Sequence, residues 1–287
     1  MSTGGDTALL KVDGLSVHFA LPRRSSSIDT MGRTFAALDD VSIDVAPGGR
    51  LGIVGESGSG KSTLARAVLG LVRVREGTVT WQGRAIDYHR ASSLRALRRE
   101  LQIVFQDPFG SLDPRMTAGE AIDEALQALA GPIPVADARE RVATSLREVG
   151  LDAGLAHRYP HELSGGQCQR IAIARATVTR PRLLVCDEAV SALDVSVQAQ
   201  VVNLLDELSA RHGMALLFIS HNLVVVRQLC DDIVVLRGGR VVERGRREQI
   251  FTQPQDPYTR ALLEAVPEPD PAVQRARLSA AVAAGTA

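Results

Sequence analysis

The segment GESGSGKST, Gly55 to Thr63, constrains the fold of this chain more than any other part of the sequence. The apolar run Leu51 to Val54 comes directly before it, and the helical pattern LARAVLGL follows. Glycines let such a loop turn its backbone amides inward, and the helix adds the positive end of its dipole, so that phosphates are cradled. The context predicts a strand, a phosphate-binding loop and a helix, whereas the string alone is also compatible with a glycine-rich turn.

The residue types in this loop predict nucleotide binding. Lys61 is expected to reach the terminal phosphates, Ser62 to place its hydroxyl on Mg²⁺, and Thr63 to bond an inner phosphate. The predicted nucleotide contacts in the loop are Gly55, Glu56, Ser57, Gly58, Ser59, Gly60, Lys61, Ser62 and Thr63.

Short runs rich in Val, Ile and Leu alternate with longer helical patterns, which is typical of an α/β fold with crossover helices. The predicted strands are Leu9 to Phe19, Val41 to Val45, Leu51 to Val54, Thr78 to Trp81, Gln102 to Phe105, Leu183 to Asp187, Ala215 to Ile219 and Ile233 to Leu236. Between Asp107 and Leu163 helical periodicity replaces this pattern, which indicates a helical insertion. Thr117 and Glu120 in TAGE have the spacing of a capping box before a helix over Ala121 to Leu129.

The remaining segments are predicted to be loops or a hairpin. The polar stretch ALPRRSSSIDTMGRT is expected to join two strands, RGGRVVERG to form a hairpin, and the Ala-rich C-terminus to be frayed.

Bulk properties restrict the functional class. Acidic and basic residues balance at 33 each, which disfavours a broad positive field for nucleic acid. The longest apolar runs, such as Met214 to Ile219, are far shorter than the roughly 20 residues that cross a bilayer. The first residues do not resemble an export signal, so a cytoplasmic protein is expected. Cys168, Cys186 and Cys230 show no CxxC pair and are expected to be free thiols.

A second cluster is LLVCDE, Leu183 to Glu188, an apolar strand that ends in two carboxylates. Ligands bind at the carboxyl edge of an open α/β sheet, so Asp187 is predicted to hold Mg²⁺ and Glu188 to polarise an attacking water. A helix cap or a solvated turn is the alternative for these two residues taken alone.

A third cluster is LSGGQ, Leu163 to Gln167, followed by CQRIAIARA. Ser164 and Gln167 have the spacing of a capping box, and Gly165 and Gly166 are poor helix formers. The Ser hydroxyl and the glycine amides at a helix N-terminus would form a second phosphate site, but the residues alone do not say whose phosphate it binds.

LSGGQ between a P-loop and LLVCDE resembles the ABC ATPases along nearly the whole chain. The resemblance implies a P-loop NTPase (RecA-like) core with an antiparallel β subdomain and a helical insertion. It also implies a head-to-tail dimer in which Ser164, Gly165, Gly166 and Gln167 contact ATP on the partner's P-loop. The implied divisions are residues 8–106 and 164–237 for the ATPase core, 107–163 for the helical subdomain and 238–287 for a C-terminal extension.

Further family motifs fall in the family's order. Gln106 after QIVF resembles the Q-loop, which would sense Mg²⁺ and water. SALD resembles the D-loop, in which Asp194 would couple the two sites, and His221 after LLFIS resembles the switch histidine at the γ-phosphate. Phe19 resembles the aromatic residue that stacks on adenine, with Phe35 as the alternative.

Three segments resemble the oligopeptide, dipeptide and nickel importer branch, namely FQDPFGSLDPRMT, DVSVQAQ and QDPYTRALLEAVP. Many members of that branch carry a cysteine cluster for an iron–sulfur centre after the last segment, but no cysteine follows Cys230 here, so no cluster is expected. Cys168 after LSGGQ, Ala189 after the catalytic glutamate and Asn222 after the switch histidine depart from the usual pattern.

The resemblance implies a peripheral ATPase subunit at the cytoplasmic face of the membrane. Its expected partners are a second ABC ATPase subunit, permease subunits and, indirectly, a solute-binding protein, with no nucleic acid. The cargo and the choice between homodimer and heterodimer stay open. A non-transport ABC-type ATPase is the main alternative, although such proteins typically carry coiled coils, zinc modules or tandem ATPase units. A P-loop kinase or GTPase would have no need of LSGGQ.

Overall fold

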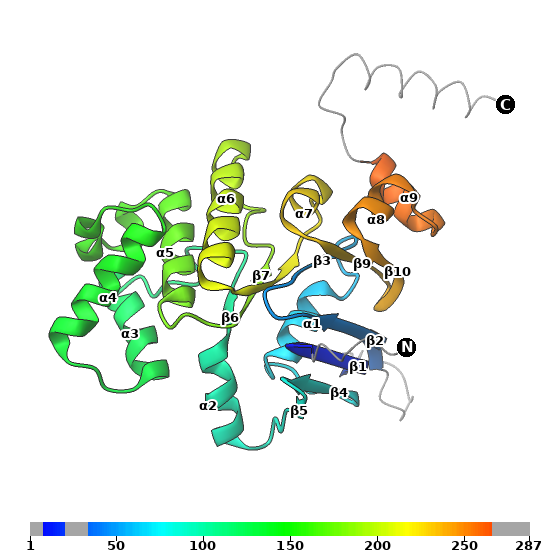
Figure 1. The fold of residues 1–287 in the computed structure, drawn as a ribbon, viewed down its shortest axis with the longest axis horizontal. Coiled ribbons are helices and arrows are strands. Elements are labelled where there is room, and N and C mark those ends of the chain that lie inside the picture. The colour runs from blue at the N-terminus through cyan, green and yellow to red at the C-terminus, as the bar shows by residue number, and fades with distance from the viewer. Residues whose placement is uncertain (1–7, 21–33, 266–287) are drawn as a thin grey trace, which may run out of the picture.

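The computed structural model describes residues 8–20 and 34–265, which form two β-sheets and the helices around them (Figure 1). One sheet is four-stranded and antiparallel, in the order β2-β1-β4-β5, and the other is six-stranded, in the order β10-β9-β3-β8-β7-β6. The strands are β1 (Leu10–Ala20), β2 (Thr34–Val45), β3 (Arg50–Val54), β4 (Glu76–Trp81), β5 (Arg84–Ala85), β6 (Leu101–Val104), β7 (Leu183–Asp187), β8 (Ala215–Ile219), β9 (Asp232–Arg237) and β10 (Arg240–Arg246).

The large sheet is parallel from β6 to β9, and its central strands are buried on both faces. Residues of β8 alternate between two cores. Leu216 and Phe218 face a core shared with the helices of the insertion, whereas Leu217 and Ile219 face a core shared with the antiparallel sheet. The continuous apolar runs of β7 and β8 follow from this double coverage.

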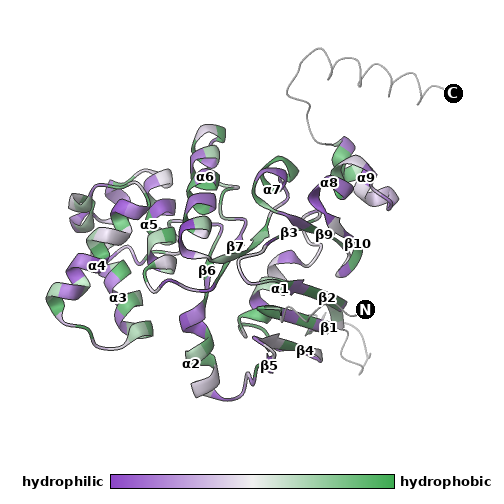
Figure 2. Ribbon diagram, in the orientation of Figure 1, coloured by the Kyte–Doolittle hydropathy of each residue, from purple (hydrophilic) through white to green (hydrophobic). Residues whose placement is uncertain are grey.

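The helices cover the sheets and carry apolar stripes rather than apolar surfaces all round (Figure 2). They are α1 (Lys61–Val68), α2 (Ala91–Glu100), α3 (Ala118–Ala130), α4 (Val135–Glu148), α5 (Gly165–Thr177), α6 (Val195–His212), α7 (Leu223–Leu229), α8 (Arg247–Thr252) and α9 (Pro257–Glu264), with 3-10 turns at Ala153–His157 and Pro160–Glu162. Among the described residues, no helix has the length and apolar character needed to cross a membrane.

The predicted strands are all present, with differences at their ends. β2 begins at Thr34 rather than Val41, because it pairs with β1 along its whole length, from Leu10 opposite Val45 to Ala20 opposite Thr34. β6 ends at Val104, one residue before the predicted end. The hairpin of RGGRVVERG is confirmed as β9 and β10. The loop predicted before Thr34 and the frayed tail fall in 21–33 and 266–287, outside the described residues.

The helix predicted within residues 107–163 is confirmed, and it begins at Ala118. The Thr117 amide donates to Glu120 at 2.7 Å, and the Glu120 amide donates to the Thr117 hydroxyl at 3.3 Å, which completes the capping box. The helices α3 and α4 pack on each other and on α5, which leads back to the large sheet. The signature segment LSGGQ therefore lies where the insertion rejoins the sheet.

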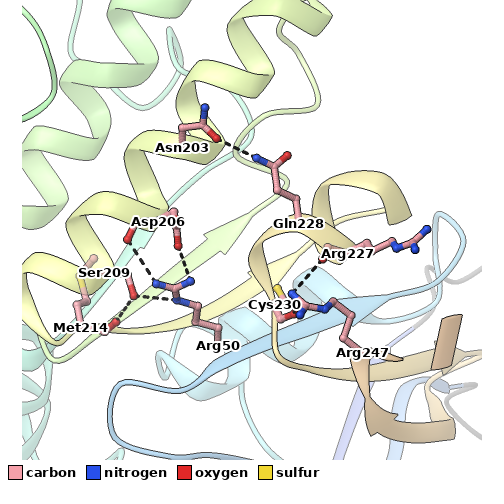
Figure 3. A network of polar contacts seen from close by, with 9 residues as sticks. All are labelled: Arg50, Asn203, Asp206, Ser209, Met214, Arg227, Gln228, Cys230 and Arg247. Atoms are coloured by element: carbon pink, nitrogen blue, oxygen red, sulfur yellow. Dashed lines mark hydrogen bonds and ion pairs between the residues drawn. The ribbon is translucent and has the colours of Figure 1, made fainter. Parts of the chain in front are cut away.

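Arg50 fixes the amino end of β3 to helix α6 (Figure 3). Its guanidinium pairs with the Asp206 carboxylate and donates to the Ser209 hydroxyl at 3.3 Å, while that hydroxyl donates to the Met214 carbonyl at 2.8 Å. This network lies at the end of β3 opposite the glycine-rich loop. It anchors the strand that carries the loop.

Candidate functional site

Three neighbouring strands deliver the predicted chemical groups to one edge of the large sheet. The order β3-β8-β7 is parallel, so the carboxyl ends of these strands meet at the same edge. The loop Gly55 to Gly60 follows β3, Asp187 is the last residue of β7 and Glu188 comes directly after it, and His221 follows β8. Residues more than 100 positions apart in the sequence therefore lie within reach of each other.

Two glycines of the P-loop are required by backbone conformation and by close packing. Gly55 has φ of 151°, and a Cβ there would collide with the carbonyl oxygen of Leu236. Gly60 has φ of 105°, and its Cβ would lie 2.6 Å from the Ala37 carbonyl oxygen. Only glycine fits such positions, so the loop is held between β9 and the antiparallel sheet.

Lys61 is 4% exposed and folds back onto the loop. Its Nζ donates to the carbonyl oxygens of Gly55 at 2.8 Å and Glu56 at 2.7 Å. Burial lowers the pKa of the ammonium, and the nearby carboxylates of Glu188, Asp187 and Glu56 oppose that shift. The ammonium therefore lies against the loop backbone and is hydrogen-bonded to neutral carbonyl groups.

Ser62 and Asp187 meet across the sheet edge, where the serine hydroxyl donates to Asp187 Oδ1 at 2.8 Å. Asp187 is 5% exposed. Burial raises the pKa of its carboxyl group, while the Ser62 hydrogen bond and the charges of Arg66 and Lys61 act in the opposite direction. A hydroxyl and a carboxylate oxygen are hard oxygen donors of the kind that Mg²⁺ takes.

Glu188 has an unusual backbone conformation that holds its carboxylate beyond the end of β7. Its φ is 52°, in the left-handed region that costs a residue with a Cβ about 1–2 kcal/mol. Its amide donates to the Ile219 carbonyl at 3.0 Å, and its carbonyl accepts from the Ser191 amide at 3.0 Å and hydroxyl at 2.9 Å. The carboxylate Oε2 lies 3.4 Å from His221 Nδ1. Glu188 and His221, two separately predicted site residues, therefore lie next to each other.

Gln106 follows β6 of the large sheet, whereas the two aromatic candidates lie on β1 and β2 of the antiparallel sheet. Gln106 lies two residues beyond the end of β6, the strand that pairs with β7, and it is exposed. Phe19 and Phe35 are register partners, 43% and 52% exposed. The choice between these two rings as the adenine-stacking residue therefore stays open.

The LSGGQ segment forms the N-terminus of α5. The Ser164 amide donates to the Gln167 side chain at 2.9 Å, and the Gln167 amide donates to the Ser164 hydroxyl at 3.3 Å, which confirms the capping box. A Cβ on Gly166 would lie 2.7 Å from Cγ1 of Val197, whereas one on Gly165 would make only ordinary contacts, the nearest at 3.8 Å. Packing against α6 explains Gly166 but leaves Gly165 without a steric reason inside the chain.

The two glycines are expected to respond differently to substitution. Gly166→Ala should lower the free energy of unfolding by about 1–2 kcal/mol relative to Gly165→Ala, because only the former forces Val197 to move. Both changes lie in the first turn of α5, so the gain in helix propensity from glycine to alanine is about the same in the two variants. Urea unfolding of the two variants measures the difference, and equal stabilities would contradict the packing argument.

Asp194 caps the N-terminus of α6. Its carboxylate accepts from the Ser196 hydroxyl at 2.7 Å and the Val197 amide at 3.0 Å, and these hydrogen bonds lower its pKa. The resemblance to the family predicts a second role for Asp194, the coupling of the two ATP sites of a dimer, besides this capping of α6.

The departures from the family pattern are accommodated by the fold. Asn222 caps α7 by accepting from the Val224 amide at 3.0 Å, as an aspartate would. Ala189 is 1% exposed beside Glu188, and Cys168 is fully buried in the insertion core. The three cysteines are all buried and unpaired, as expected.

One contact of the P-loop was missed by the sequence reasoning. The Glu56 amide donates to the Tyr258 hydroxyl at 3.0 Å, across more than 200 residues. Tyr258 lies in QDPYTRALLEAVP, which was noted only for its resemblance. No local pattern links this segment to the loop.

Comparison with known families gives two matches. Residues 38–191, more than half of the chain, match the family described as ABC transporter. Residues 242–284 match the family described as oligopeptide/dipeptide transporter, C-terminal region.

Similar proteins and solved structures agree with these matches. The oligopeptide transport ATP-binding protein OppF of Escherichia coli K12 is 46% identical, with 95% of this chain and 82% of that protein covered. A putative peptide import ATP-binding protein of Brucella ovis is 47% identical, with 93% and 81% covered. CbiO1 of Clostridium perfringens, part of an ABC transporter complex, is similar in structure (TM-score 0.72, 27% identity, 86% and 92% covered). So is the ATP-binding cassette MJ0796 in a dimeric post-hydrolysis state with ADP and phosphate (TM-score 0.73, 27% identity, 83% and 98% covered).

Proposed function

The chain belongs to the ABC transporter ATP-binding family and is an ATP-hydrolysing subunit, and from this premise we propose how its residues bind and hydrolyse ATP. The loop Gly55 to Thr63 holds the phosphates, and Lys61 leaves the Gly55 and Glu56 carbonyls to bind them. Glu188 accepts a proton from the attacking water, and His221, 3.4 Å from that carboxylate, contacts the γ-phosphate. The observation that carries this proposal is the assembly of these groups at one sheet edge.

Ser62, Asp187 and Gln106 are the proposed Mg²⁺ ligands, and the fit is supported by the 2.8 Å contact between the Ser62 hydroxyl and Asp187. Within the described ranges, no cluster of three or more His, Cys, Asp or Glu side chains is poised to hold a metal by itself. Mg²⁺ typically takes one or two protein oxygens and completes its shell with phosphates and water. The ion would neutralise charge on the phosphates of ATP.

A head-to-tail pair of such subunits is the proposed working unit. Ser164, Gly165, Gly166 and Gln167 would contact ATP held by the partner's P-loop, and Asp194 would couple the two sites. Gly165 has no steric reason inside its own chain, because a Cβ there would make only ordinary contacts, and this supports the approach of a ligand to that position. The similar cassette MJ0796 is dimeric. The partner is either a second copy or a similar subunit.

Import of peptides or a related small solute, such as a nickel chelate or an opine, is the proposed transport function. It is supported by relatives described as oligopeptide and peptide import ATP-binding proteins and by the C-terminal family match. The subunit would sit peripherally at the cytoplasmic face of the membrane, with permease subunits as direct partners and a solute-binding protein as an indirect one. The insertion 107–163 lies beside Gln106 and is the proposed permease contact.

Crosslinking from the insertion tests this assignment. Arg115 is exposed, with 87% of its side chain accessible, and the three native cysteines are fully buried. Arg115→Cys therefore introduces a single accessible thiol for a photoreactive maleimide. In membranes from cells that coexpress the candidate permease pair, we expect a crosslink to a permease subunit.

The matched control is Lys11→Cys, on β1 in the antiparallel sheet, where the side chain is 54% exposed. It should label equally well and give no permease crosslink. Equal crosslinking from both positions would show that the insertion is not the specific contact.

A further inference from the structure

The peptide unit between Gly55 and Glu56 is held from two sides. Its carbonyl oxygen, on Gly55, accepts from Lys61 Nζ at 2.8 Å, and its amide, on Glu56, donates to the Tyr258 hydroxyl at 3.0 Å. Because a peptide unit is planar, the two contacts together fix the orientation of this whole peptide group. One of these contacts comes from the P-loop lysine and the other from the C-terminal helix α9.

Tyr258 is itself held rigidly. The residue is 8% exposed, and the guanidinium of Arg237, at the end of β9, lies 4.8 Å from the centre of its ring. Farther along α9, Leu262 and Leu263 pack against the core that contains Val54, the last residue of β3. The packing around Tyr258 therefore holds its hydroxyl oxygen in place beside the loop.

The approach to α9 is also fixed by hydrogen bonds. Glu243, on β10, accepts from the amides of Gln255 at 2.8 Å and Asp256 at 3.1 Å. Asp256 in turn caps α9 by accepting from the Tyr258 amide at 2.8 Å. These contacts join Tyr258 to the edge of the large sheet by a short series of bonds.

From these contacts we infer that Tyr258 is a positioning residue for the P-loop, acting through the Glu56 amide. The inference rests on the proposed ATP site. When Lys61 turns toward the phosphates, the Gly55 carbonyl loses the hydrogen bond from Lys61, and the Tyr258 contact remains to keep the peptide in its binding orientation. The C-terminal segment thereby contributes to ATP affinity through the P-loop, without touching the nucleotide.

Removal of the Tyr258 hydroxyl tests the inference, because Tyr258→Phe keeps the ring and its contact with Arg237. We expect the Kd for ATP, measured by calorimetry, to rise roughly three- to tenfold, which corresponds to one net hydrogen bond. The KM for ATP should rise by the same factor while kcat at saturating ATP stays within about twofold. Without nucleotide, amide hydrogen exchange of the peptide spanning residues 51–60 should become faster.

Two control variants separate positioning from mere stability. Tyr88→Phe removes another phenol that donates to a backbone carbonyl, that of Val68, at 2.9 Å. Thr259→Val removes a buried hydroxyl on α9 that has no hydrogen-bond partner among the described residues, and should stabilise that helix. Both changes should shift the melting temperature and leave the Kd for ATP unchanged.

The outcomes are distinguishable. If Tyr258→Phe binds ATP as the wild type does, or if the Kd of all three variants follows their melting temperatures, Tyr258 only anchors α9 and the inference is wrong. If the wild-type chain binds no ATP, the proposed function itself fails.

Discussion

Glu188→Gln is expected to lower the rate of ATP hydrolysis by about 10²- to 10⁴-fold, the usual contribution of a general base, while leaving ATP binding intact. Glutamine has the same size as glutamate and can adopt the same left-handed backbone conformation, with φ of 52°. The contacts of the Glu188 main chain with Ile219 and Ser191 are therefore preserved. The side chain loses its negative charge and, with it, the ability to accept a proton.

The mass of this variant in solution, with and without Mg-ATP, gives a second readout, because blocked hydrolysis should trap a closed pair. An ATP-dependent dimer would support self-pairing and both composite sites. A monomer that still binds ATP would point to a different partner subunit or to a requirement for the permease. Glu207→Gln, on the exposed side of α6, is the matched control and should hydrolyse ATP as the wild type does. Wild-type turnover by Glu188→Gln would contradict the assigned role.

The secondary structure was predictable because local patterns and tertiary packing agree. The strands β7 and β8 are apolar at every position except Asp187, the last residue of β7, and both faces of each strand are covered. The capping boxes at Thr117 and Ser164 were predictable because their partners lie only three residues away. The first half of β2 was missed because its only clear signal is its pairing with β1, which is non-local.

The site was predictable as a set of motifs but not as a geometry. That Asp187 and Glu188 end a strand follows from the sequence, whereas the left-handed conformation of Glu188 is imposed by contacts with β8 and with Ser191. The packing of Val197 on Gly166 and the bond from Glu56 to Tyr258 join segments distant in sequence. A single sequence carries no signal for either contact.

Lys61→Met is expected to raise the Kd for ATP by about 10²- to 10⁴-fold, because two charge-assisted hydrogen bonds to phosphate oxygens are each worth roughly 1.5–3 kcal/mol. The chain has two lysines, Lys61 and Lys11, and all its other basic residues are arginine or histidine. A compact ammonium is therefore a specific choice at position 61. Lys61→Arg should also bind poorly, because a guanidinium is larger than the buried ammonium and has a different donor geometry.

The free energy of unfolding of Lys61→Met without nucleotide should stay within about 1 kcal/mol of the wild-type value. Burial already lowers the pKa of Lys61, so the folded chain without ATP disfavours the charged ammonium, and an apolar side chain of similar length removes that cost. Lys11→Met, at an exposed position, is the control for loss of a lysine and should keep ATP-induced stabilisation. Calorimetry and thermal unfolding with ATP separate the two variants. If Lys61→Met kept the ATP-induced rise in melting temperature, the ammonium would only stabilise the loop and would not bind phosphate. Loss of that rise in an otherwise stable protein would identify Lys61 as a phosphate ligand that hydrogen-bonds to the loop when ATP is absent.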